Sequence, residues 1–67
     1  MKVNFYNLNN NDTERQIIFL SLTTYASGKE EINVLFDGIE YKAPVYFDYK
    51  GNRSFKRAGK IYNFTIN

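Results

Sequence analysis

Hydrophobic and polar residues alternate along much of this chain, which is the pattern of β-strands that bury one face. In residues 2–8, Val3 and Phe5 fall on one face and Asn4 and Tyr6 on the other. The same period of two, with β-forming residues between turn residues, predicts strands over residues 32–36, 39–43, 45–49, 54–57 and 60–66. Short strands that follow one another this closely are typical of an antiparallel sheet.

Short turns separate these expected strands. Asp37 and Gly38 form a two-residue connection, and this dipeptide readily adopts the positive φ angles of a type I′ hairpin. Pro44 has no amide donor, so a strand that includes it lies at a sheet edge or breaks there. Residues 50–52 (Lys-Gly-Asn) and 58–59 (Ala-Gly) predict the remaining turns.

The last expected strand has an irregular pattern. Ile61 falls out of phase with Phe64 and Ile66, so the three side chains cannot share one face of a regular strand. An extra residue in one strand would restore a common face, and it would also bend the strand locally. We therefore expect a β-bulge or a twist near Asn63.

Residues 12–27 carry signals for both a helix and a strand. As a helix, the segment would begin after Asn11, with Glu14 completing a capping box, and it would end at Gly28. As a strand, residues 16–25 would place apolar side chains on both faces. Ile, Phe, Thr and Tyr form strands better than helices, so the composition favours the strand.

The fold class that these elements predict is mostly β: a small antiparallel sheet or an SH3-like barrel of five or six short strands. The alternative is an α+β fold in which one helix over residues 12–27 packs on a four-stranded antiparallel sheet. Either fold makes residues 1–67 a single small domain, because so short a chain buries only about 60% of its unfolded surface. Six Tyr and six Phe supply bulk for a core, and a homodimer would add burial.

The composition excludes several classes of site. The chain has no Cys and no His, so it offers no disulfide, no thiol nucleophile and none of the usual zinc ligands. The acids Glu30, Glu31, Asp37 and Glu40 lie in or near expected turns, where solvated carboxylates are common. The glycines match no phosphate-binding loop. We therefore expect a protein that is not an enzyme and that uses no cofactor or metal.

Two further features bear on where the protein acts. No apolar run approaches the about 20 residues of a membrane-spanning helix, and residues 1–11 lack the pattern of a signal peptide. We therefore expect a cytoplasmic protein that binds no membrane. Asn, Ile, Lys, Phe and Tyr make up 33 of the 67 residues, and their codons are rich in A and T. This usage suggests a low-GC bacterium, a phage or another mobile element as the source.

Charge is distributed unevenly along the chain. Residues 1–41 contain three Lys or Arg and six Asp or Glu, whereas residues 42–67 contain six and one. Five of these cations fall within residues 48–64, among four aromatic residues. The candidate binding residues in this stretch are Tyr49, Lys50, Arg53, Phe55, Lys56, Arg57, Lys60 and Tyr62. Cations and aromatic rings on one strand pair suit either a polyanion or an acidic protein surface.

The basic aromatic stretch supports more than one function. The first expectation is a small stoichiometric regulator or inhibitor that docks on a larger protein with an acidic surface, because Tyr and Arg are enriched at protein interfaces. The alternative is direct binding of nucleic acid, with cations on phosphates and rings stacked on bases. An assembly subunit that completes a neighbour's sheet is a third possibility. The cations alone are also typical of the solvated face of a sheet.

Overall fold

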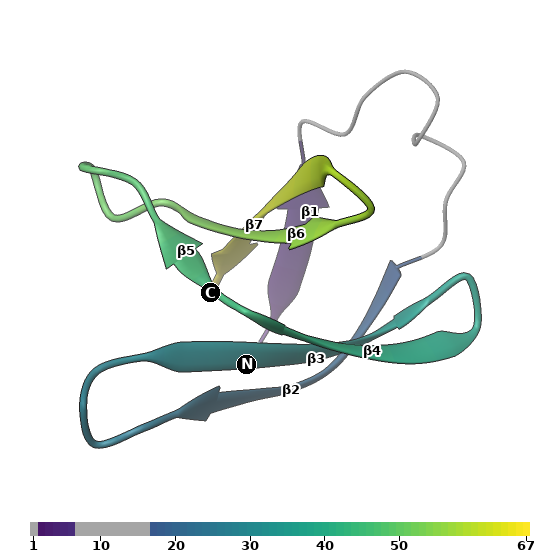
Figure 1. Cartoon of the computed structure of the whole chain (residues 1–67), viewed down its shortest axis with the longest axis horizontal. Helices are drawn as coiled ribbons and strands as arrows, with labels where there is room; N and C mark the ends of the chain where they lie inside the picture. Colours follow the sequence, from purple (N-terminus) through teal and green to yellow (C-terminus); the bar gives the residue numbers. More distant parts are fainter. Residues whose placement is uncertain (1, 7–16) are drawn as a thin grey trace.

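The computed structural model describes residues 2–6 and 17–67, and every regular element in these residues is a β-strand. Figure 1 shows the strands, which are β1 (Val3–Tyr6), β2 (Ile17–Thr24), β3 (Glu30–Phe36), β4 (Ile39–Pro44), β5 (Tyr46–Phe47), β6 (Arg53–Arg57) and β7 (Lys60–Ile66). The predicted mostly β fold is confirmed. The described strands number seven rather than five or six, because residues 17–24 form a strand in addition to the six that the alternation predicts.

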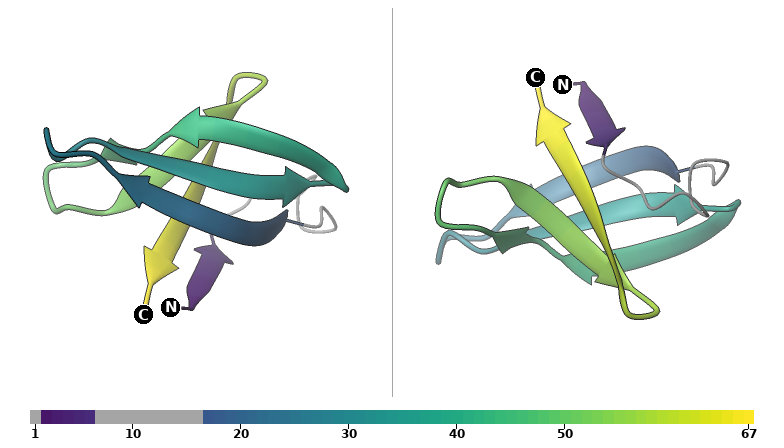
Figure 2. Two further views of the ribbon diagram at one scale, coloured as in Figure 1. Left: turned by 90° about the horizontal axis from the view of Figure 1, so that it is seen from below. Right: turned by 90° about the horizontal axis from the view of Figure 1, so that it is seen from above.

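The strands form two antiparallel sheets. One has the order β1-β7-β6-β5 and the other has the order β2-β3-β4. Figure 2 shows that the strands of one sheet cross those of the other at a steep angle. Backbone hydrogen bonds between Lys2 and Asn67 hold the two ends of the chain side by side, next to β1 and β7.

Residues 17–24 form β2, so the helix that was the alternative for residues 12–27 is wrong over the part that the structure describes. The chain then turns toward β3, and the Gly28 amide closes this turn by donating a hydrogen bond to the Tyr25 carbonyl. Residues 12–16 lie outside the described residues. The strand preference of the β-branched and aromatic side chains outweighs the capping signals at the ends of the segment.

The β3–β4 hairpin has the geometry that its sequence predicts. Asp37 has a φ of 52° and Gly38 a φ of 85°, and a type I′ turn requires positive φ at both positions. Phe36 pairs with Ile39 across the turn, and the register continues without a shift to Pro44. Because β4 is the outer strand of its sheet, Pro44 lies at a sheet edge, as expected from its missing amide donor.

The core lies between the two sheets. Its buried side chains are Ile32, Val34, Phe36, Ala43, Val45, Phe55, Tyr62 and Phe64. The Tyr62 ring stacks on Phe55 at 5.3 Å between ring centroids and makes an edge contact with Phe36 at 5.1 Å. Aromatic side chains bury large areas, so these rings supply much of the core of a chain that has no disulfide.

The irregular strand of the structure is β2. Between Phe19 and Ser21 its register against β3 shifts, so Leu20 is the extra residue of a β-bulge. The bulge changes which side chains face inward, and as a result Leu22 joins Ile17 and Phe19 against the core. The alternation of apolar residues in this segment gave no indication of the shift.

In β7 the predicted bulge near Asn63 is wrong. β6 and β7 pair in an unbroken register along the whole of their contact. Ile61 is exposed and lies opposite Lys56, while Tyr62 and Phe64 face the core. The residue that looked out of phase is an isoleucine on the outer face of a regular strand.

Two polar contacts join the sheets beside the core. The Arg53 guanidinium on β6 binds the Glu30 carboxylate at the start of β3 through two hydrogen bonds, Nε to Oε1 at 2.8 Å and Nη2 to Oε2 at 3.2 Å. The Tyr41 hydroxyl on β4 donates a hydrogen bond of 2.9 Å to the Lys56 carbonyl on β6. These contacts hold β6 against β3 and β4, and they thereby position the hairpin that β6 forms with β5.

Candidate interaction surface

The candidate binding residues lie on the β5–β6 hairpin and beside the β6–β7 turn. The hairpin starts at Val45, whose side chain is buried and whose amide donates a hydrogen bond of 2.9 Å to the Glu30 carbonyl. β5 then pairs with β6 over only two residues. Because β5 is the outer strand of the four-stranded sheet, both of its side chains, Tyr46 and Phe47, are exposed.

Three exposed aromatic side chains on this hairpin each have a cation over the ring. Tyr46 and Phe47 are each 46% exposed, and Tyr49 is 92% exposed. The distances from cation to ring centroid are 4.9 Å for Lys56 over Tyr46, 5.2 Å for Arg53 over Phe47 and 5.6 Å for Lys50 over Tyr49. Such a contact stabilises by about 0.5–1 kcal/mol at an exposed site, so it restrains the cationic side chain only weakly. These six residues are called the hairpin surface below.

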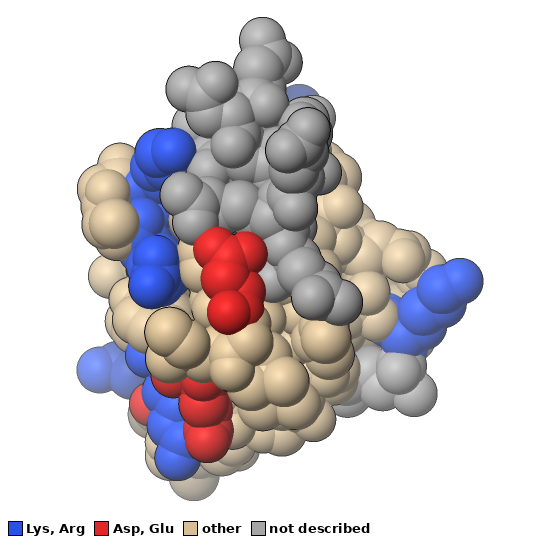
Figure 3. Space-filling view, turned by 90° about the vertical axis from the view of Figure 1, so that its right-hand side faces the viewer, with Lys and Arg blue, Asp and Glu red and all other residues tan. Residues whose placement is uncertain are grey.

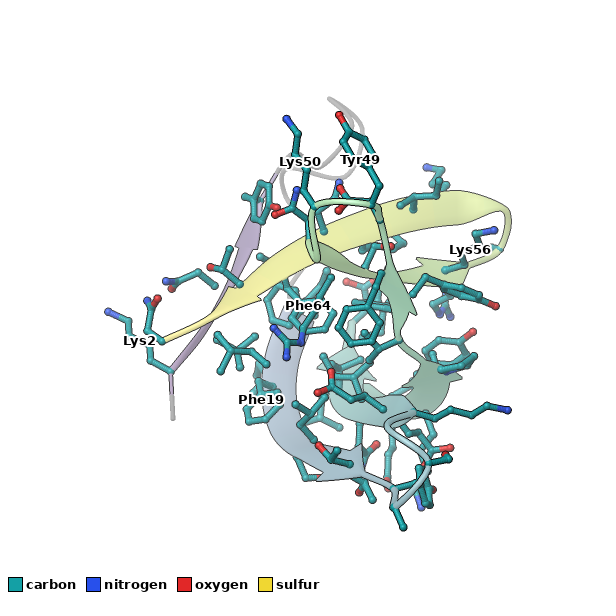
Figure 4. The ribbon with its side chains drawn as sticks, turned by 90° about the vertical axis from the view of Figure 1, so that its left-hand side faces the viewer. Lys2, Phe19, Tyr49, Lys50, Lys56 and Phe64 are labelled. Carbon is teal, nitrogen blue, oxygen red and sulfur yellow. The ribbon has the colours of Figure 1, made fainter. Side chains whose placement is uncertain are left out.

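A hydrogen-bonded turn holds the tip of the hairpin surface. The Asp48 carboxylate accepts hydrogen bonds from the Lys50 and Asn52 amides at 2.8 Å each and from the Asn52 side chain at 2.9 Å. Gly51 has a φ of 83°, which glycine adopts without steric cost, and its amide donates to the Asp48 carbonyl. Figure 4 shows that Tyr49 and Lys50 point away from the molecule at this tip.

Acid should loosen this turn. The hydrogen bonds from Asn52 are the main cause that lowers the pKa of Asp48 below its ordinary value of 3.8. Because the pKa is lower in the folded state, the carboxylate stabilises the turn above about pH 4, and this contribution is lost as the pH falls through the lowered pKa. We expect the amide chemical shifts of Lys50 and Asn52 to titrate with a midpoint below 3.8. Asp48→Ala should remove the titration, and a midpoint at or above 3.8 would contradict the assignment.

Two candidate residues belong to the core rather than to the surface. Phe55 is 0% exposed and Tyr62 is 2% exposed, and their rings stack on each other between the sheets. Neither side chain can reach a partner in this fold, so we leave both out of the hairpin surface. Their inward position follows from the pairing of β6 with β7, which the spacing of cations and rings does not reveal.

Arg57 and Lys60 lie at the far end of β6 from the hairpin tip, where they face each other across the β6–β7 turn. The Arg57 guanidinium lies 4.3 Å from the centroid of the Phe36 ring and 5.6 Å from that of Tyr41. It therefore covers an edge of the core. The structure thus separates the candidate cations into two groups, one on the hairpin surface and one beside this turn.

The hairpin surface carries only a modest positive charge. Arg53 is 32% exposed and its partner Glu30 is 9% exposed, and the hydrogen bonds that Arg53 donates to the Glu30 carboxylate raise the pKa of Arg53 above its ordinary range. Lys50 and Lys56 are the exposed cations of the hairpin surface. Figure 3 shows the end of the molecule that carries the β3–β4 and β6–β7 turns, where blue side chains form a short run along one side and red and blue side chains lie together below it.

The candidate binding residues predicted from the sequence did not include Tyr46 and Phe47, although both lie on this surface. Phe47 has the spacing of a core residue, two positions after the buried Val45. It is half exposed because β5 is an edge strand, and Arg53 lies over its ring there. No local signal marks this exposure, because the edge position of β5 depends on the order of the strands in the sheet.

Other kinds of site were also sought in the described residues. No group of three or more His, Cys, Asp or Glu side chains in residues 2–6 and 17–67 is placed to hold a metal ion. The same residues contain no helix that is long and apolar enough to span a membrane. Comparisons with protein-family models, with curated proteins and with solved structures found nothing that matches this chain.

Proposed function

We propose that this protein is a non-enzymatic binding protein that docks its hairpin surface on an acidic surface of a larger protein. It would regulate or inhibit that protein by stoichiometric binding. The observation that carries the proposal is the presence, on one hairpin, of three exposed aromatic rings that each lie beside a cation. Aromatic residues and Arg are enriched at protein interfaces, and clustered apolar groups on a surface favour association.

The charge of the hairpin surface favours a protein partner over nucleic acid. Binding to a phosphate backbone relies on several uncommitted cations, because each neutralised phosphate adds to the affinity. Lys50 and Lys56 are available, but Arg53 is bound to Glu30. The Asp48 carboxylate, which accepts a hydrogen bond from the Lys50 backbone amide, also places a negative charge at the tip of the hairpin. Aromatic rings with a few lysines around them match the apolar centre and polar rim of a protein interface.

The shape of the hairpin surface adds to this argument. Tyr46 and Lys56 lie on the outer face of the four-stranded sheet, while Phe47 lies on the side of the core, beneath Arg53. The tip with Tyr49 extends beyond both sheets (Figure 4). A ridge of this kind presents aromatic groups on two flanks, so we expect it to enter a groove with acidic side chains at its rim.

Changing the hairpin tip should weaken partner binding without loss of stability. In the double variant Tyr49→Ala/Lys50→Glu, both side chains are exposed, so the unfolding midpoint in urea should stay within error of wild type. Loss of one aromatic anchor and reversal of one rim charge should weaken binding at least about tenfold, which is about 1.4 kcal/mol. Lys42→Glu is the matched control, because it makes the same charge reversal on exposed β4.

The experiment is a quantitative pull-down from a nuclease-treated lysate of a low-GC bacterium, with wild type, the double variant and Lys42→Glu immobilised at equal density. We expect an acidic protein that wild type and Lys42→Glu retain in near-stoichiometric amounts and that the double variant loses. Equal retention by all three proteins would count against the hairpin surface.

Fluorescence anisotropy tests the alternative function, which is direct binding of nucleic acid. We expect no binding of labelled single-stranded DNA, duplex DNA or RNA at about 50 mM salt. Micromolar binding that collapses at about 200 mM salt and is lost in the double variant would replace the protein partner with nucleic acid.

Composition extends the proposal to the setting of this protein. We further propose that it acts in the cytoplasm and, from its abundance of residues whose codons are rich in A and T, that a phage or another mobile element encodes it. A host protein would then be the natural target of the hairpin surface. If the pull-down retained only proteins of an extracellular compartment, this setting would be wrong.

A further inference from the structure

In the part of the chain that the structure describes, no strand pairs with the outer edge of β2. β2 is the longest strand in the described residues. It is also one of the two outer strands of its sheet, as the left view of Figure 2 shows. Its sequence, IIFLSLTT, contains no charged residue and no proline. Proteins commonly protect sheet edges with short strands, Lys or Pro. The other outer strands have such features, since β5 has two residues, β4 contains Lys42 and Pro44, and the four residues of β1 follow Lys2.

The pairing of β3 shows which backbone groups of β2 face the open edge. In a two-residue hairpin the residues that flank the turn exchange backbone hydrogen bonds, so Phe36 bonds to Ile39 of β4. Every second residue before Phe36 likewise directs its amide and carbonyl to β4 and away from β2. This agrees with Glu30, whose carbonyl accepts the Val45 amide. The residues between them, such as Glu31, therefore bond to β2.

The same alternation continues on β2 itself. Thr23 lies opposite Glu31, so its amide and carbonyl point to β3. Tyr25 lies two residues after Thr23, and its amide donates a hydrogen bond of 2.8 Å to the Lys29 carbonyl, which precedes β3. The Tyr25 amide therefore points to the same side as that of Thr23. Leu22 and Thr24 consequently direct their amides and carbonyls away from β3, toward the open edge.

We propose that β2 pairs in antiparallel fashion with β2 of a second copy of this chain, with Thr23 facing Thr23 across the twofold axis. Leu22 and Thr24 would then exchange about four backbone hydrogen bonds with Thr24 and Leu22 of the second copy. A twofold arrangement is self-complementary, because each strand offers the groups that the other needs. The two Thr23 side chains would form a Thr–Thr cross-strand pair, which is favourable in antiparallel sheets.

The bulge places this pairing in the second half of β2. Bulges disturb ladder pairing and twist the strand, so the edge around Leu20 is a poor docking site. From Ser21 to Thr24 the register against β3 is regular. A pairing centred on Thr23 would also bring Tyr25, which is half exposed, opposite Ser21 of the second copy. The resulting sheet would have six strands.

The test is the mass of the protein in solution, measured by sedimentation equilibrium from about 1 μM to about 1 mM, the range over which weak complexes dissociate. We expect the mass of wild type to rise with concentration from 7.9 kDa toward twice that value. Thr23→Lys should remain at 7.9 kDa throughout, because it sets two like charges opposite each other. The new Lys also lies opposite Glu31 of its own chain, so the fold should be retained.

Two further variants make the test specific. Thr65→Lys is the matched control, because it is the same substitution at an exposed position of β7, which pairs on both sides, and it should dimerise like wild type. Thr24→Pro removes an amide that would face the second copy, but it breaks no hydrogen bond to β3. This variant should therefore also be monomeric. A wild type that stays at 7.9 kDa up to the highest concentration would overturn the proposal, as would a Thr23→Lys protein that dimerises as well as Thr65→Lys. Neither result depends on the hairpin surface.

Discussion

In the variant Phe55→Ala, most molecules are expected to be unfolded at room temperature. The Phe55 ring is fully buried and contacts Phe5, Tyr41, Tyr62 and Phe64 at centroid distances of 5.3 to 6.4 Å. Truncation of a buried Phe costs about 3–5 kcal/mol. A core of this size rarely supplies more than about that amount, so little net stability would remain.

Urea unfolding followed by circular dichroism measures this effect. Phe55→Leu keeps an apolar side chain in the same site, so we expect it to stay folded with a lower midpoint. Tyr49→Ala is the control for the loss of an aromatic ring, because Tyr49 is almost fully exposed and the midpoint should hardly change. If Phe55→Ala unfolded at the same urea concentration as Tyr49→Ala, the core described above would be wrong.

Arg53→Ala should destabilise the protein by about 1–3 kcal/mol, the second largest effect that we expect. The substitution leaves the Glu30 carboxylate, which is 9% exposed, without the two hydrogen bonds that it accepts. Loss of one member of a fully buried ion pair costs more, about 3–5 kcal/mol, but Arg53 is about one third exposed and water can partly replace it.

A double-mutant cycle separates this ion pair from its surroundings. The variant Glu30→Ala should cost less than Arg53→Ala, since the remaining guanidinium is the more exposed partner and can turn toward solvent. The double variant should be more stable than the sum of the two single losses predicts, because it leaves no unpaired carboxylate. Strictly additive losses would mean that the two side chains do not stabilise each other.

The same variant clarifies the role of Arg53 in binding. Sequence reasoning placed Arg53 among the residues that meet a partner, whereas its bonds to Glu30 show that it also joins the two sheets. Loss of binding in Arg53→Ala could therefore follow from loss of structure. The Tyr49→Ala/Lys50→Glu variant avoids this ambiguity, because neither side chain contacts the core.

Local sequence signals identified most strands of this protein. The Asp37-Gly38 dipeptide predicted one hairpin. Gly51 and Gly59, which both have a positive φ, marked the turns before the two strands that follow. These features depend on residues close together in sequence, which is why they can be recognised without a structure. The strand preference of residues 17–24 likewise exceeded the helix-capping signals around it.

The arrangement of side chains on faces was harder to predict. The pattern suggested a bulge near Asn63, where there is none, and gave no sign of the one at Leu20. A bulge depends on how two strands fit together with the rest of the core, and a single strand does not contain that information. For the same reason Phe55 and Tyr62 looked like surface residues among the cations around them, although they form the centre of the core.

The sequence by itself determined that this protein is a small β protein without Cys or His, rich in aromatic residues and with its cations concentrated after residue 41. Only the tertiary structure decided which of these rings and cations are available to a partner. The packing of two crossed sheets buries Phe55, ties Arg53 to Glu30 and leaves Tyr46, Phe47 and Tyr49 exposed at an edge. Exposure depends on contacts between residues far apart in the chain, so composition and spacing cannot specify it.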